Sequence, residues 1–157
     1  VKENNIIHVE QENKELGYVG KPIKVNTDLL NDILLKEFIP IITPMGLDQE
    51  GQAYNINADT AAGALARSLK SRRLLLATDV DGVLDENEKL ISEIKPTEAE
   101  KLINQQTIHG GMIPKVRTCI DAVNNGVRGV VIIDGRKPHS ILFEIFSDQG
   151  AGTLIRK

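Results

Sequence analysis

Two acidic side chains, Asp79 and Asp81, stand two positions apart in the stretch Asp79–Leu84. This stretch directly follows the apolar run Leu74–Ala77, so both carboxylates would lie on the turn after a strand and could face one site. Carboxylates placed in this way can attack a phosphoryl group or act as a general acid and base. The same residue types also suit an ordinary turn, in which Asp and Gly are common.

A second polar group, Asn55, Asn57 and Asp59, alternates along the stretch Tyr54–Asp59. We expect a helix to begin at Asn57 or Ala58, where free backbone N–H groups favour an anionic ligand. The alternative is a simple helix start, with Asn57 as the N-cap and Asp59 in the first turn.

A third stretch, Gly110–Lys115, joins two glycines to a proline and a lysine. The glycines would let the backbone approach a ligand closely, and Pro114 suits a first helical turn. A lysine near a helix start is unfavourable for the helix dipole unless a phosphate also lies there. The alternative is a solvated surface lysine.

These stretches fall at the junctions of alternating strand and helix patterns. The patterns predict strands at about residues 6–9, 18–25, 39–42, 73–79, 129–134 and 153–155, and helices beginning near residues 26, 58, 97, 112 and 139. A capping box of Thr97 and Glu100 is expected to open the third helix. Continuously apolar central strands predict a three-layer α/β/α sandwich with a mainly parallel central sheet, in which ligands bind beyond the carboxyl ends of the strands.

Composition bounds the possibilities. The 157 residues are 41% hydrophobic with a net charge of −3, which predicts one folded domain over residues 1–157 and excludes a disordered chain. No apolar run approaches the length of a membrane span, and the few aromatic residues and the lack of a basic stripe argue against nucleic-acid binding. The single cysteine, Cys119, and the absence of a visible leader predict a cytoplasmic protein. No zinc-type spacing is found, and no metal ligand is predicted.

Six stretches together resemble the N-acetylglutamate kinases of the amino-acid kinase family, in that family's order and spacing. They are Leu16–Gly20, Tyr54–Asp59, Thr78–Leu84, Gly110–Lys115, Asp134–Arg136 and Gly150–Thr153. The resemblance implies a carbamate-kinase-like fold and an enzyme that uses MgATP to phosphorylate the side-chain carboxylate of N-acetyl-L-glutamate in arginine biosynthesis.

The resemblance also implies roles for individual residues. Lys115 would stabilise the transferring phosphoryl group, Asp59 would orient the catalytic lysines, and Asn55 and Asn57 would bind the acylated amino acid. The nucleotide pocket would be formed by Asp79, Val80, Asp81, Gly82, Val83, Leu84, Thr107, Ile108, His109, Gly111 and Met112. Mg²⁺ would be held mainly by the ATP phosphates.

The resemblance covers only the carboxyl-terminal, ATP-binding part of such an enzyme, and the amino-terminal half has no counterpart here. We therefore expect the isolated chain to be inactive, and we expect a homo-oligomer. An arginine effector would bind near Glu144, Gly150 and Gly152, although Val131 replaces a histidine that arginine-sensitive members often carry.

Three alternatives remain open from the sequence, and one of them is a sister amino-acid kinase with another acceptor. The chain could be a truncated nucleotide-binding module without catalysis, which would self-associate through its exposed edge. It could also be a haloacid-dehalogenase-like phosphatase with Asp79 as nucleophile and Asp81 as acid/base, which the Asp79–Leu84 loop resembles locally.

Overall fold

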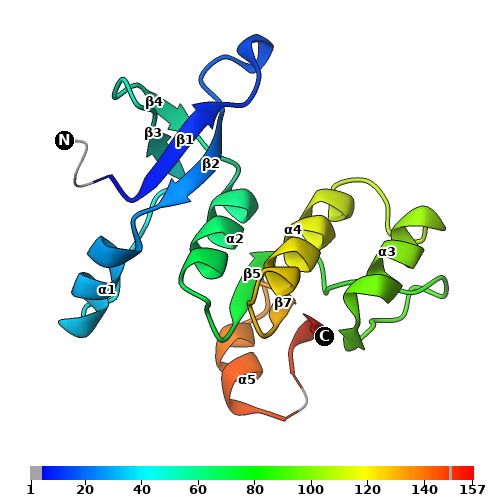
Figure 1. Ribbon diagram of the computed structural model, residues 1–157. Coiled ribbons are helices and arrows are strands. Elements are labelled where there is room, and N and C mark those ends of the chain that lie inside the picture. The colour runs from blue at the N-terminus through cyan, green and yellow to red at the C-terminus, as the bar shows by residue number, and fades with distance from the viewer. Residues whose placement is uncertain (1–4, 149) are drawn as a thin grey trace. The chain divides into compact units, whose positions relative to one another are not determined.

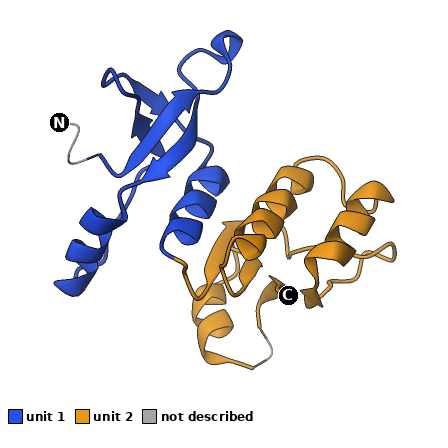
Figure 2. Cartoon of the chain, in the orientation of Figure 1, with its two compact units in different colours: residues 1–69 blue, residues 70–157 orange. Residues whose placement is uncertain are grey.

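The computed structural model describes residues 5–148 and 150–157, and its contacts divide the chain into two compact units, residues 1–69 and 70–157 (Figures 1 and 2). Among the described residues, no helix has the length and apolar character needed to cross a membrane.

The first unit is built on a four-stranded sheet with the order β2-β1-β3-β4. Its elements are β1 (Ile7–Gln11), a 3-10 turn η2 (Lys14–Leu16), β2 (Gly20–Val25), α1 (Thr27–Leu35), β3 (Met45–Leu47), β4 (Ala53–Asn55) and α2 (Ala58–Ser68). β1 runs antiparallel to β2 and parallel to β3, and β3 runs antiparallel to β4. One part of the core joins the strands to α2 through Ile7, Val9, Tyr54, Ile56 and Ala61.

Asparagine side chains cap the amino-terminal ends of both helices of the first unit. The Asn26 side chain accepts a hydrogen bond from the Leu29 N–H (3.2 Å), and the Asn57 side chain accepts one from the Thr60 N–H (3.1 Å). Such caps satisfy N–H groups that a helix leaves unpaired at its first turn. The predicted starts of these two helices are therefore confirmed.

The predicted strand at residues 39–42 is wrong. These residues form no strand, and the Ile39 and Ile41 side chains are 90% and 95% exposed. Pro40 has no N–H to donate to a ladder, and no neighbouring strand of the described chain takes up this segment. An apolar run alone cannot show whether such a partner strand exists.

The second unit contains a four-stranded sheet with the order β5-β7-β8-β6. Its elements are β5 (Leu74–Thr78), β6 (Glu93–Ile94), α3 (Pro96–Asn104), α4 (Met112–Asn124), β7 (Val130–Asp134), α5 (Ser140–Phe146) and β8 (Gly152–Ile155). All five residues of β7 are buried, so both faces of this strand are covered, and α4 and α5 each pack against it. The predicted α/β character is thus confirmed.

The sheets are mixed rather than mainly parallel, which corrects the expectation from the sequence. β5 and β7 are parallel, as are β6 and β8, but β7 and β8 are antiparallel. The reason lies in the connection through α5, which leaves β7 at Asp134 and returns to Gly152 opposite Ile133, at the same edge of the sheet. A strand that starts where its predecessor ends must run in the opposite direction.

The start of α3 also differs from the prediction. The helix begins at Pro96, and the reciprocal cap is formed by Lys95 and Glu98 rather than by Thr97 and Glu100. The Lys95 N–H donates a hydrogen bond to the Glu98 carboxylate (3.2 Å). Proline favours the first helical position because its fixed φ suits the helix and its missing N–H is not needed there.

Candidate functional site

A cavity of about 420 Å³ lies in the second unit, beyond the carboxyl end of β5 and beside the start of α4. It is lined by Thr78, Asp79, Val80, Gly82, Val83, Leu84, Thr107, Ile108, His109, Gly110, Gly111, Met112 and Lys115. Ten of the eleven residues predicted for the nucleotide pocket are in this lining, together with Lys115. The structure therefore brings together residues from two separate stretches of the sequence, 78–84 and 107–115.

One hydroxyl group, that of Thr153 on β8, fixes the loop that forms a wall of this cavity. Its Oγ1 accepts a hydrogen bond from the Val83 N–H (2.8 Å) and donates one to the Ile91 carbonyl oxygen (2.6 Å). Thr153 is fully buried, so its hydrogen bond with the Val83 N–H is shielded from water. The loop that follows β5 is consequently held at two points against the sheet.

Gly82 allows this close packing. Its φ of +146° is unfavourable for other residues, and a Cβ atom there would lie 2.6 Å from the Thr153 Oγ1 and 2.7 Å from the Leu90 Cδ1. The Asp81-Gly82 pair suits an ordinary turn by its residue types. In the structure it is also the place where the backbone comes close to Thr153 and Leu90.

Lys115 reaches the cavity from the first turns of α4, and Gly110 and Gly111 precede that helix. A Cβ atom on either glycine would meet nothing within 4 Å, so the space beside this backbone is open. Open backbone next to a lysine and a helix start is an arrangement that suits phosphate oxygens. The space beside Gly110–Lys115 is therefore open for the phosphate that the sequence predicts there.

Asp81 is the exception among the predicted nucleotide residues, because it does not line the cavity. Its carboxylate pairs with the Lys137 Nζ at 2.7 Å, and both side chains are about half exposed. Thr78 and Gly110 also line the cavity, although the sequence did not predict them as site residues. Both adjoin predicted residues, so the signal that could have identified them was their position at the ends of the two motifs.

Asp134 forms a buried charge next to this site. The Arg136 guanidinium donates to both of its carboxylate oxygens (2.9 and 3.0 Å), and the Arg136 backbone N–H adds a third bond (2.9 Å). These bonds lower the pKa of Asp134 to about 2, against the opposing effect of burial. The adjacent Gly135 N–H donates to the Thr78 carbonyl oxygen (2.8 Å), which ties this turn to a residue of the cavity.

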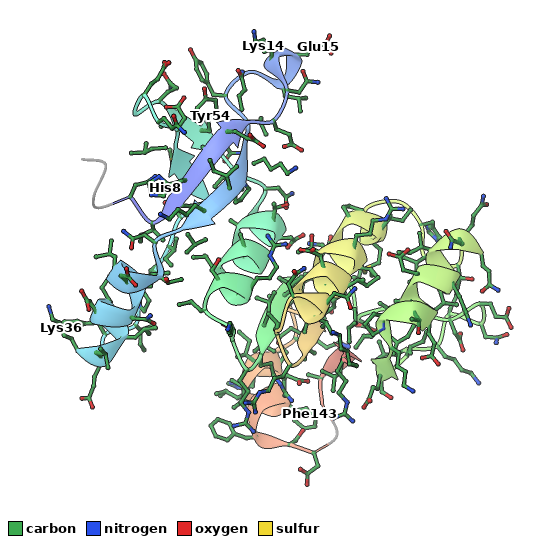
Figure 3. All side chains as sticks on the ribbon, in the orientation of Figure 1. His8, Lys14, Glu15, Lys36, Tyr54 and Phe143 are labelled. Carbon is green, nitrogen blue, oxygen red and sulfur yellow. The ribbon has the colours of Figure 1, made fainter. Side chains whose placement is uncertain are left out.

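The polar residues predicted to bind the substrate lie in the first unit, at the junction of β4 and α2. Asn55 and Asn57 are exposed and alternate with the buried residues Tyr54 and Ile56. Figure 3 labels Tyr54 and so locates this junction. The Asn55 N–H donates to the Tyr18 carbonyl oxygen (2.9 Å), which joins two of the six stretches of the resemblance. The Asn57 side-chain oxygen Oδ1 caps α2, which leaves the side-chain N–H₂ as the group that could contact a ligand.

Asp59 stands in the first turn of α2, in the first unit, whereas Lys115 belongs to the second unit. The expected action of these two residues on one substrate therefore stays a prediction. Within the described residues, no group of three or more His, Cys, Asp or Glu side chains is arranged to hold a metal ion.

A second cavity, of about 330 Å³, contains the three residues expected to contact an effector. Glu144, Gly150 and Gly152 line it together with Arg73, Ser92, Glu93, Ser147, Asp148 and Leu154. The buried Glu144 carboxylate accepts hydrogen bonds from the Arg73 Nη1 (2.9 Å) and the Ala151 N–H (2.8 Å). Val131 is fully buried in β7 and is not part of this lining.

Comparison with known proteins agrees with this architecture. Residues 3–134 match the amino acid kinase family. The chain belongs to the amino acid kinase family. The Asp79–Leu84 loop lies within this match, so the family membership does not support the haloacid-dehalogenase alternative.

Among its relatives, the acetylglutamate kinase of Pelagibacter ubique is 56% identical over 156 residues. That match covers 99% of this amino acid kinase chain but 54% of the relative, so the chain spans about half the length of this relative.

Two solved structures support the fold. The N-acetylglutamate synthase of Neisseria gonorrhoeae, solved with coenzyme A and L-arginine, matches with a TM-score of 0.90 at 25% identity, over 98% of this chain and 37% of that one. The carbamate kinase of Giardia lamblia bound to AMP-PNP matches with a TM-score of 0.71 at 20% identity, over 98% and 60%. The carbamate-kinase-like fold is therefore confirmed.

The Thr153→Val variant tests the anchoring of the cavity wall. Valine keeps the shape of threonine but leaves the Val83 N–H and the Ile91 carbonyl oxygen unpaired, so the free energy of unfolding should fall by about 1–3 kcal/mol. Urea denaturation measures this loss. The matched control is Thr97→Val, at an exposed position on α3, which should change stability by less than about 0.5 kcal/mol. Equal effects of the two changes would contradict the anchoring role.

The Arg136→Gln variant tests the electrostatics of Asp134. Because the pKa of Asp134 is lowered from 3.8 to about 2, ionised Asp134 stabilises the fold above its unfolded-state pKa, and this contribution is lost as the pH falls toward 2. Without Arg136 the pKa returns toward its ordinary value, so stability at neutral pH should drop and its decrease in acid should become shallower. Urea denaturation at a series of pH values measures both effects. The control Lys137→Gln removes a half-exposed cation and should change the acid profile less.

Proposed function

We propose that this chain is the ATP-binding part of an acetylglutamate kinase, an enzyme of arginine biosynthesis in the cytoplasm. The observation that carries the proposal is the joint lining of one cavity by the Asp79–Leu84 loop, the Thr107–His109 stretch and Lys115. The 56% identity to the Pelagibacter ubique acetylglutamate kinase supports the choice of this enzyme within the family.

The cavity suits a nucleotide in both its apolar and its polar parts. Val80, Val83, Leu84, Ile108 and Met112 offer apolar side chains for the faces of a purine base. Lys115 and the open backbone of Gly110 and Gly111 offer a cation and N–H groups for phosphate oxygens. Mg²⁺ would enter with ATP and be held mainly by its phosphates and by water.

The reaction needs positioning more than it needs proton transfer. MgATP supplies the phosphoryl group, and the acceptor is a carboxylate with a free pKa of about 4.3, so it is already ionised near neutral pH. Lys115 would stabilise the charge that develops on the phosphoryl oxygens. Asp59 would hold the catalytic lysines in place, and Asn55 and the Asn57 amide group would position N-acetyl-L-glutamate.

Arginine is proposed as an effector at the second cavity. Glu144 is a buried carboxylate that accepts a hydrogen bond from the Arg73 guanidinium group, and this pairing supports recognition of a second guanidinium group at the same carboxylate. A free arginine would have to displace Arg73 or share Glu144 with it. The N-acetylglutamate synthase structure with L-arginine supports an arginine site in a protein of this fold.

A second candidate function is a nucleotide-binding module without catalysis that associates with itself. The observation that favours it is the exposure of large apolar side chains between α1 and β3. Leu35, Phe38, Ile39 and Ile41 are each at least 65% exposed. Apolar surface of this kind favours association, either with further copies in a homo-oligomer or with the rest of a longer enzyme.

Nucleotide binding is tested first. Calorimetric titration of the 157-residue chain with Mg²⁺ and a non-hydrolysable ATP analogue should give saturable binding. In Lys115→Gln, binding should weaken by about tenfold or more because a charge-assisted contact to phosphate is lost. Lys101→Gln, on the exposed surface of α3, is the control with unchanged affinity. A folded chain that gives no heat would refute the proposal.

Catalysis is tested in a longer protein. The chain is fused to the amino-terminal portion of the Pelagibacter ubique acetylglutamate kinase that it does not cover, and ADP release is followed with and without N-acetyl-L-glutamate. Turnover should require the acceptor and should fall roughly 10²- to 10³-fold in Lys115→Gln. A folded chimera that binds the ATP analogue without turnover would favour the non-catalytic module instead.

A further inference from the structure

Four arginine side chains surround a hollow of about 220 Å³ in the second unit. Arg72, Arg73, Arg128 and Arg156 line it together with Gly129 and Leu154. The whole chain has seven arginines, so more than half of them meet at this one place. No described acidic residue contributes to the lining, although the chain as a whole is acidic.

The sheet topology brings these arginines together. Arg72 and Arg73 precede β5, Arg128 precedes β7, and Arg156 follows β8. Leu74 pairs with Val130, and Val130 pairs with Ile155, so the three chain segments reach the sheet edge at the same level (Figure 1). This is the edge at the amino ends of β5 and β7, opposite the edge at which the nucleotide-cavity loop leaves β5 after Thr78.

The charges in the hollow are only partly compensated. Arg73 pairs with Glu144 at 2.9 Å, and Arg156 pairs with both carboxylate oxygens of Glu93 at 2.7 and 3.0 Å. Within residues 5–148 and 150–157, no carboxylate pairs with Arg72 or Arg128. Two guanidinium groups thus remain to attract an anion, and a concave site concentrates their field.

Gly129 adds a backbone donor. This glycine is buried, its carbonyl oxygen accepts a hydrogen bond from the Leu74 N–H (3.1 Å), and its own N–H donates to no acceptor in the described part of the chain. Buried N–H groups without an acceptor are rare in folded proteins. A ligand in the hollow would supply an acceptor for it.

We propose that this hollow is a binding site for a small phosphate-class dianion, separate from the nucleotide cavity. Guanidinium groups bind phosphate oxygens through paired N–H donors, and a dianion balances the two uncompensated charges. The hollow has about half the volume of the nucleotide cavity, which favours inorganic phosphate or a small phosphorylated molecule over a nucleotide.

The test uses inorganic phosphate and the 157-residue chain. Amide chemical shifts are followed by ¹H–¹⁵N NMR during a phosphate titration at constant ionic strength, set with chloride. Saturable shifts should centre on Arg73, Arg128 and Gly129. The Arg72→Gln/Arg128→Gln double variant should lose at least tenfold in phosphate affinity, whereas Arg117→Gln, which removes the same type of charge from an exposed position on α4, should not.

Three results would overturn the proposal: shifts scattered over the surface, shifts confined to the cavity between Asp79 and Lys115, or equal affinities in the double variant and the control. Binding at the nucleotide cavity is measured separately. Binding of the ATP analogue should be unchanged in the double variant, so failure of the phosphate site leaves the proposed kinase function standing. Both replaced side chains are exposed, and the single Arg72→Gln variant serves if the double variant does not fold.

Discussion

The second unit depends on one buried hydroxyl group. Thr153 is the point at which β8, the loop after β5 and the approach to β6 meet, and its two hydrogen bonds tie these segments together. Gly82 must have no side chain for the loop to come this close. Since Val83 and Leu84 follow directly, the shape of the apolar wall of the cavity is set by a contact outside the cavity. Any ligand that uses this wall therefore depends on the integrity of β8.

The two ends of the strands in the second unit carry different kinds of side chain. At the carboxyl end of β5, a loop presents apolar side chains and acidic residues, with Lys115 as the cation that lines the cavity. At the amino ends of β5 and β7, the chain presents four arginines. The parallel strands β5 and β7 bring Arg72, Arg73 and Arg128 to one level, and Arg156 joins them because β8 runs antiparallel to β7. The separation of these ends would let the two proposed anionic ligands bind without direct competition.

Much of the site could be predicted because its signals are local. Asn26 and Asn57 identify helix starts by their own hydrogen bonds, and the motifs around Asp79 and Gly111 mark the turns after strands. The failures involve partners that are distant in sequence. The Asp81 carboxylate pairs with Lys137, and the direction of β8 depends on the path through α5. The run at residues 39–42 has no neighbouring strand among the residues that the structure describes. None of these long-range pairings has a periodic signature along the chain.

The residues proposed to bind the nucleotide and those proposed to bind the acceptor belong to different units. Neither unit alone therefore carries all the residues of the proposed reaction. Phosphoryl transfer to a carboxylate brings anionic groups together, so cations must offset their repulsion at the point of transfer. Lys115 is the lysine that lines the nucleotide cavity of the second unit, and the residues proposed for the acceptor belong to the first. One lysine can bind a terminal phosphate, but it cannot also draw in a second anion. Nucleotide binding is therefore a property that the second unit could have by itself, whereas transfer would require further cations from outside it.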